Sequence, residues 1–149
     1  MTTVVDYKPD AERLLQKLKE MGLKLGIVTT TKRTNMEIYR HANQNIQRKA
    51  PLDEYFSFIY TREDAREMKP NPEIYHRVLR EQQITPEDCL IFEDSLVGVE
   101  AANRAGIAVV AMYDRYSDHE RDAINARADY RFDRYADVLA VIEAEQVVC

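Results

Sequence analysis

The sequence lacks the features that mark secreted, membrane-spanning and disulfide-bonded proteins. Its 149 residues include only two cysteines, one in a predicted strand and one at the C-terminus, which form neither a disulfide framework nor a zinc-binding pattern. No apolar run approaches the roughly 20 residues of a transmembrane helix, and no apolar segment of a signal peptide opens the chain. These absences predict a protein of the reducing cytoplasm with no membrane partner.

Positive charge is also scarce. The chain has 21 lysines and arginines against 26 acidic residues, a net charge of -5, which argues against a general surface for nucleic acid or anionic lipid. A small phosphorylated ligand needs only a few local cations, so the charge does not exclude one. There is no internal repeat, no low-complexity tract and no sign of a second domain, and the length predicts one domain over residues 1–149.

Short apolar segments alternate with helical patterns along the chain. The pattern predicts strands at 23–28, 56–60, 89–92, 107–112 and 130–132, and helices at 9–21, 34–46, 95–105, 117–127 and 137–148, with another helix starting at Pro72. Strands that alternate with helices in this way predict an α/β fold, with a parallel sheet covered by helices on both faces.

The most informative stretch runs from Cys89 to Gly106. Its first four residues predict a strand buried on both faces, because nothing polar interrupts them. Glu93 and Asp94 follow at the carboxyl end of that strand, where open α/β sheets place their ligand crevice. Ser95 can cap the next helix, and Gly106 can end it. Paired carboxylates suit Mg²⁺, whereas the alternative is that acids are simply favoured at a helix N-terminus.

Two other segments could carry chemistry. Thr29, Thr30 and Thr31 offer hydroxyls and backbone N–H groups at the start of a helix, with Lys32 and Arg33 beside them, and such a terminus can bind an anion. The alternative is an ordinary threonine cap.

Lys69, between Met68 and Pro70, is either a binding cation or a solvated surface lysine. Together with Glu93 and Asp94, these groups would bind a phosphate dianion and offset the charge that develops during its transfer.

Three segments resemble known motifs. VTTTKR, MKPNPEIY and IFEDSLVGVEAANRAG resemble motifs II, III and IV of the haloacid dehalogenase superfamily, and most closely those of its phosphatase and β-phosphoglucomutase-like branch. The resemblance implies a three-layer, Rossmann-like core with a parallel sheet. It also implies Mg²⁺-dependent hydrolysis or mutase chemistry on a small phosphorylated metabolite.

The resemblance also implies roles for individual residues. Thr29 and Thr30 match the phosphate-binding positions of motif II, and Lys69 matches the lysine that steadies phosphate and nucleophile. The remaining matches are Glu93 and Asp94 as Mg²⁺ ligands, with Lys32, Arg33 and Asn71 as substrate contacts.

One part of the family pattern is missing. No DxDGT sequence, which supplies the nucleophile and the general acid/base of motif I, occurs in this chain, and the cap domain is missing too. Without an aspartate nucleophile there is no covalent intermediate. The central strand that carries motif I could be supplied by another piece of a longer protein, by a partner chain or second copy, or by Thr2–Val5 of this chain. The last choice makes Asp6 the nucleophile, with Lys8 in place of the second acid; otherwise Asp6 is an exposed linker residue.

Three functions therefore remain open at this stage. The first is a phosphohydrolase or phosphomutase, the second a non-catalytic phosphate- and metal-binding module, and the third an interaction fragment that accepts a strand from a partner.

Overall fold

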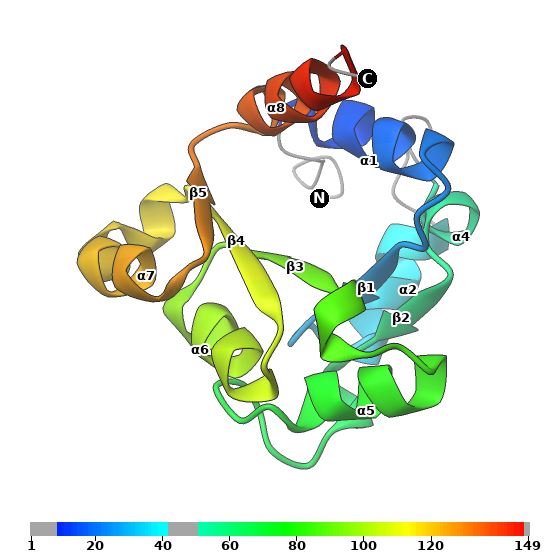
Figure 1. Ribbon diagram of the computed structural model, residues 1–149. Coiled ribbons are helices and arrows are strands. Elements are labelled where there is room, and N and C mark those ends of the chain that lie inside the picture. The colour runs from blue at the N-terminus through cyan, green and yellow to red at the C-terminus, as the bar shows by residue number, and fades with distance from the viewer. Residues whose placement is uncertain (1–8, 42–50, 148–149) are drawn as a thin grey trace. The chain divides into compact units, whose positions relative to one another are not determined.

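The computed structural model describes residues 9–41 and 51–147, and every strand pair in these segments is parallel (Figure 1). This confirms the predicted α/β class. The chain divides into two compact units: one contains the described residues up to Glu63 and those from Arg134 onward, and the other is Asp64–Asp133. No helix within the described segments is long and apolar enough to cross a membrane. The single domain over 1–149 stays a prediction.

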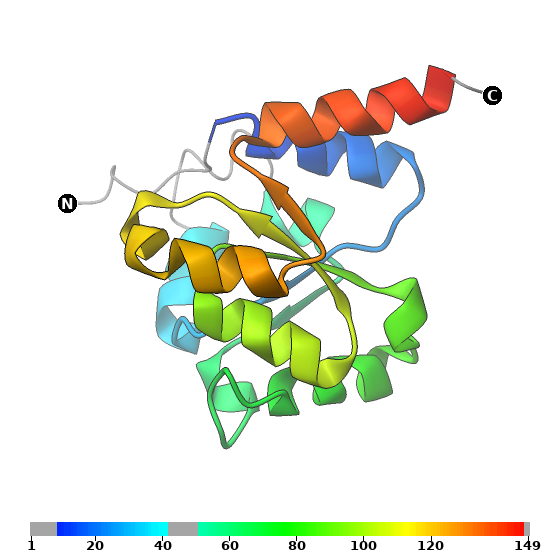
Figure 2. The same cartoon turned by 60° about the vertical axis from the view of Figure 1, so that its left-hand side comes forward.

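The first unit holds a two-stranded sheet. Its elements are α1 (Ala11–Glu20), β1 (Gly26–Val28), α2 (Arg33–His41), α4 (Leu52–Tyr55), β2 (Phe58–Tyr60) and α8 (Tyr135–Val147). β1 and β2 pair in parallel with Gly26 opposite Phe58, and a side chain at position 26 would overlap the Phe58 ring. Met36 and Leu52 form a small buried core beside this sheet. α1 lies against α8 (Figure 2).

The second unit holds a three-stranded sheet in the order β3-β4-β5. Its elements are α5 (Glu73–Gln82), β3 (Leu90–Glu93), α6 (Leu96–Ala105), β4 (Ala108–Met112), α7 (Arg121–Arg127) and β5 (Tyr130–Phe132), with short 3₁₀ turns η2 (Pro86–Asp88) and η3 (Arg115–Glu120). The middle strand β4 is the apolar centre, because Val109 to Met112 are all buried. α6 contacts β3 and β4, and its fully buried Ala101 and Ala102 allow a close approach.

Several predicted boundaries are confirmed. Ser95 caps α6 by accepting a hydrogen bond from the N–H of Gly98 at 3.3 Å, and Gly106 ends α6 at a φ of 75°, where glycine is favoured. The helix expected at 34–46 is observed as Arg33–His41, and its remaining part lies outside the described residues. The strands expected at 23–28 and 56–60 shorten to three residues each.

One expectation about burial is wrong. The strand at 89–92 was expected to be buried on both faces, and Ile91 is buried, but Leu90 is 50% exposed. Successive strand residues point to opposite faces. β3 is an edge strand of its sheet among the described residues, and the face that carries Leu90 is only partly covered there.

The core of the second unit should be sensitive to lost volume. Ile124 in α7 is 1% exposed, so Ile124→Ala should lower the free energy of unfolding by about 2–4 kcal/mol in urea titrations. As a control, Val141→Ala in α8, where the side chain is 47% exposed, should change it by about 0.5 kcal/mol or less. Equal losses in the two variants would contradict the assigned core.

Candidate active site

The threonines after β1 form a local turn. The N–H of Thr29 donates to the carbonyl of Tyr60 at 3.0 Å, which extends the pairing of β1 with β2 by one residue. Thr29 Oγ1 accepts the N–H of Thr31 at 3.1 Å and lies 3.1 Å from Thr31 Oγ1. These contacts of Thr29 form a turn before α2 and do not cap the helix, because Thr31 precedes Arg33, its first residue. The role of Thr29 toward phosphate stays a prediction. Thr30 is exposed beside it.

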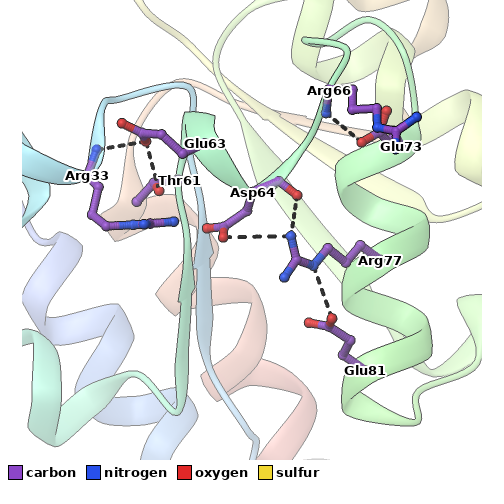
Figure 3. Close-up of polar contacts among 8 residues, drawn as sticks. All are labelled: Arg33, Thr61, Glu63, Asp64, Arg66, Glu73, Arg77 and Glu81. Carbon is purple, nitrogen blue, oxygen red and sulfur yellow. Dashed lines mark hydrogen bonds and ion pairs between the residues drawn. The ribbon is translucent and has the colours of Figure 1, made fainter.

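The side chain of Glu63, which follows β2 in the chain, contacts the N-terminus of α2. Glu63 Oε1 accepts the backbone N–H of Arg33 at 2.9 Å and the hydroxyl of Thr61 at 3.2 Å (Figure 3). The hydrogen bond from the Arg33 backbone is the main reason why the pKa of Glu63 lies below its ordinary value. One of the donors expected to attract an outside anion is therefore bound to the protein's own acid. The side chains of Lys32 and Arg33 are exposed.

The loop that carries Lys69 is tied to the start of α5. The Glu73 carboxylate accepts the backbone N–H groups of Arg66 at 2.6 Å and Glu67 at 3.2 Å, and the first of these is the main cause of a lowered Glu73 pKa (Figure 3). Asn71 Oδ1 in turn accepts the N–H of Glu73, the first residue of α5, at 2.9 Å. The Lys69–Pro70 peptide bond is cis.

Arg77 of α5 holds the beginning of the same loop. Its guanidinium donates to the carbonyl oxygen of Asp64 at 2.5 Å, lies 3.7 Å from the Asp64 carboxylate, and donates to Glu81 at 3.0 Å (Figure 3). Together with the contacts of Glu73, this fixes both ends of the segment from which Lys69 projects.

Lys69 meets Glu93 in a largely buried ion pair. Lys69 Nζ donates to Glu93 Oε1 at 2.5 Å, and the two side chains are only 6% and 12% exposed. The hydroxyl of Tyr75, on α5, donates to the same oxygen at 2.9 Å, and the Tyr75 ring lies 5.0 Å from the Lys69 ammonium. Burial first, and the Glu93 charge second, raise the pKa of Tyr75 well above its ordinary value, so its hydroxyl keeps its proton. The idea of a solvated surface lysine is therefore wrong.

The Glu93 carboxyl group also depends on a glycine. Glu93 ends β3, and a side chain at Gly98, in the first turns of α6, would overlap the Glu93 carboxyl group. Gly98 is thus what lets the carboxylate lie between the strand and the helix. No sequence pattern indicates this contact, since Gly98 is spaced like any other residue of the helix.

The acid pair fits a hydrated divalent cation. Glu93 Oε2 and the Asp94 carboxylate are hard oxygen donors, and Mg²⁺ is commonly held by one or two carboxylates together with several waters. In the segments that the structure describes, no group of three or more His, Cys, Asp or Glu side chains is placed to hold a metal. The assignment of Glu93 and Asp94 as Mg²⁺ ligands stays a prediction, in which water molecules complete the coordination.

The predicted site residues fall into three sets. The structure brings Lys69 and Glu93 together, with Asp94 next in sequence, all in the unit Asp64–Asp133. Thr29 and its neighbours belong to the other unit, and Asp6 lies outside the described residues.

Four side chains that support these groups were missed as functional residues: Glu63, Glu73, Tyr75 and Arg77. The position of Glu63 could have been anticipated, because parallel strands end at the same edge of a sheet. An acid that follows β2 is then close to the start of α2, which follows β1. The other three give no such signal.

The Glu73 contacts predict acid sensitivity. A carboxylate whose folded-state pKa is lowered adds stability above its unfolded pKa of about 4.3, and this stability is lost as the pH falls through the folded value. Glu73→Gln should therefore flatten the decline of unfolding stability below about pH 4.5, measured by urea titration. The control Glu143→Gln, at an exposed position, should leave the decline of unfolding stability at low pH unchanged. An equal effect of both variants would reject the role assigned to the Glu73 hydrogen bonds.

The Gly98 contact predicts a compensating pair. Gly98→Ala should destabilise the protein by about 1–3 kcal/mol through overpacking, although alanine is ordinarily the better helix former by about 1 kcal/mol. In a Glu93→Ala background the overlap is gone, so Gly98→Ala should become neutral or stabilising in urea unfolding. Equal effects of Gly98→Ala in the two backgrounds would show that the residues do not touch.

Comparison with known proteins identifies the family of this chain. The family model for haloacid dehalogenase-like hydrolases matches residues 2–112. The chain is 33% identical over 134 residues to the protein CbbY of Cereibacter sphaeroides, covering 90% of this chain and 55% of that protein. It is 35% identical over 99 residues to a phosphorylated carbohydrates phosphatase of Thermotoga maritima, covering 66% and 43%.

The fold is also found in solved structures. CbbY from Rhodobacter sphaeroides in complex with phosphate superposes with a TM-score of 0.74 at 32% identity, over 88% of this chain and 55% of that one. The chain thus spans about half the length of the relatives it matches. The family match over most of its length is decisive, and the chain belongs to the haloacid dehalogenase-like hydrolases.

Proposed function

We propose that this protein binds the phosphoryl group of a small phosphorylated metabolite and hydrolyses it with the help of Mg²⁺. The observation that carries the proposal is the buried Lys69–Glu93 pair at the carboxyl end of β3. Lys69 lies in the segment MKPNPEIY that resembles motif III, which implies a phosphate-binding lysine, and one relative is named for phosphorylated carbohydrates. A sugar phosphate is therefore the preferred substrate class.

The phosphate would be held by charge and by directed donors. The Lys69 ammonium would offset charge on the non-bridging oxygens as the phosphoryl group transfers. The Thr29 hydroxyl and the backbone N–H of Thr30 are candidate phosphate donors of the other unit. Mg²⁺ bound by Glu93 and Asp94 would neutralise further negative charge on the phosphoryl group. Lys32 and Arg33, both exposed, would attract the anion. Because Asn71 Oδ1 is bonded to the Glu73 N–H, its amide NH₂ is the group that would meet substrate.

Hydrolysis needs a nucleophile, and Asp6 is the candidate in this sequence. An Asp6 oxygen would attack phosphorus while the bond to the substrate oxygen breaks, and water would then cleave the acyl phosphate to restore the carboxylate. Lys8 stands two residues on, where the family has its second acid. Proton transfer to the departing oxygen would therefore come from water or from another segment.

A second candidate is a binding module without turnover. The missing DxDGT sequence favours it, because phosphate and metal binding need only groups that this chain retains. Among the residues that the structure describes, β3 lies at the edge of its three-stranded sheet, which favours a related role in which a partner chain or second copy adds a strand. Either role would be exercised in the cytoplasm.

Phosphate binding is tested first, because both candidates require it. Lys69→Met should weaken binding of inorganic phosphate, measured calorimetrically in the presence of Mg²⁺, by about tenfold or more, because a charged hydrogen-bond donor is lost. The exposed Lys24→Met should bind phosphate like the unaltered protein. Undiminished binding by folded Lys69→Met would reject the proposed site.

Turnover is tested at Asp6. The full chain should hydrolyse an aryl phosphate with Mg²⁺, and Asp6→Asn should lose this activity while it keeps phosphate binding. Binding of phosphate by the unaltered chain without any turnover would instead establish the binding module.

A further inference from the structure

We infer that Tyr75 is a positioning residue: its hydroxyl fixes the Glu93 carboxylate and, through that carboxylate, the Lys69 ammonium. The role in phosphate binding rests on the function proposed above. The placement of Lys69 by Tyr75 does not, and it can be tested without any ligand.

Tyr75 makes both contacts with one side chain. Its hydroxyl donates to Glu93 Oε1 at 2.9 Å, and its ring lies 5.0 Å from Lys69 Nζ, within the range of a cation–π interaction. The ammonium and the phenol therefore share a single carboxylate oxygen, since Lys69 also donates to Oε1. This leaves the Glu93 carboxylate with two donors of different origin, one from the loop before α5 and one from α5 itself.

Packing alone would not require the hydroxyl. Tyr75 is 3% exposed, and burial of a hydroxyl without a partner is costly, so a phenylalanine would be the simpler core residue here. The ring belongs to a rigid helix and has only two side-chain torsions, whereas the Lys69 side chain has four. A hydrogen bond from the rigid partner restricts the carboxylate, and the restricted carboxylate then restricts the flexible lysine.

Gly98 limits the other side of the carboxylate. Both Glu93 carboxyl oxygens and Cδ lie where a side chain at position 98 would be placed. The carboxyl group is thus held between α6 and the Tyr75 hydroxyl, and Lys69 is the member of the trio with the most side-chain torsions. Loss of the hydroxyl should therefore be felt mainly at Lys69.

The test uses Tyr75→Phe, which keeps the ring beside Lys69 and removes only the hydroxyl. Its control is Tyr113→Phe, which removes a hydroxyl bonded to Asp118 at 2.9 Å elsewhere in the same unit. The readout is the ¹⁵N ammonium resonance of Lys69, identified by its loss in Lys69→Met. A buried, ion-paired ammonium exchanges its protons slowly enough to be observed, so this resonance reports the position of Lys69 directly.

We expect the Lys69 resonance in the unaltered protein and in Tyr113→Phe, and we expect it to shift or broaden beyond detection in Tyr75→Phe. Tyr75→Phe should also weaken phosphate binding by about threefold to tenfold, with no further loss when it is added to Lys69→Met. Thermal unfolding of each variant confirms that it is folded under the conditions used.

The outcomes separate the two ideas. A Lys69 resonance that is unchanged in folded Tyr75→Phe overturns the positioning role, whatever happens to phosphate. A resonance that changes, in a protein whose phosphate binding does not depend on Lys69, supports the positioning role and rejects the proposed function. Additive effects of Tyr75→Phe and Lys69→Met on phosphate affinity would also overturn the inference, because Tyr75 would then act by a separate route.

Discussion

The buried ion pair between Lys69 and Glu93 is the constraint to which the surrounding structure is adapted. Two charges that are 6% and 12% exposed have lost most of their hydration, and the attraction between them rarely repays that loss in full. A well-packed apolar pair would give equal or greater stability. The pair is therefore better explained by what the ammonium can bind than by what it adds to folding, and the nearby residues serve to make its burial tolerable.

Those neighbours act on both partners of the pair. Tyr75 supplies a second donor to Glu93 Oε1, and Gly98 provides the space that the carboxyl group fills. On the lysine side, the loop is bound to α5 through the Glu73 carboxylate, and Arg104 donates to the carbonyl of Pro70 at 3.3 Å. A cation placed by so many contacts is preorganised, so little entropy is lost when it meets an anion.

How much of this was predictable depended on the range of each interaction. Patterns of neighbouring residues predicted the elements. Apolar runs predicted β3 and β4, Ser95 predicted the start of α6, and Gly106 predicted its end. Contacts between residues far apart in sequence gave no signal. Nothing in the spacing of 18 residues between Tyr75 and Glu93 indicates a hydrogen bond between them.

The exposure of Leu90 was missed for a related reason. Burial depends on which elements cover a strand, and an apolar run shows only that the strand can be covered.

The same long-range contacts change the view of the threonine segment. The threonine segment was predicted to bind phosphate because the first N–H groups of a helix have no partner within the helix. In the structure, Glu63 already accepts the N–H of Arg33. A dianion that approached this donor would have to displace a carboxylate and would be repelled by it. If the chain binds phosphate as proposed, the terminus of α2 would therefore contribute less to the affinity than the sequence pattern indicates, and Lys69 would contribute more. This is why the groups that hold Lys69 in place matter as much to the proposed function as the groups that would touch the ligand.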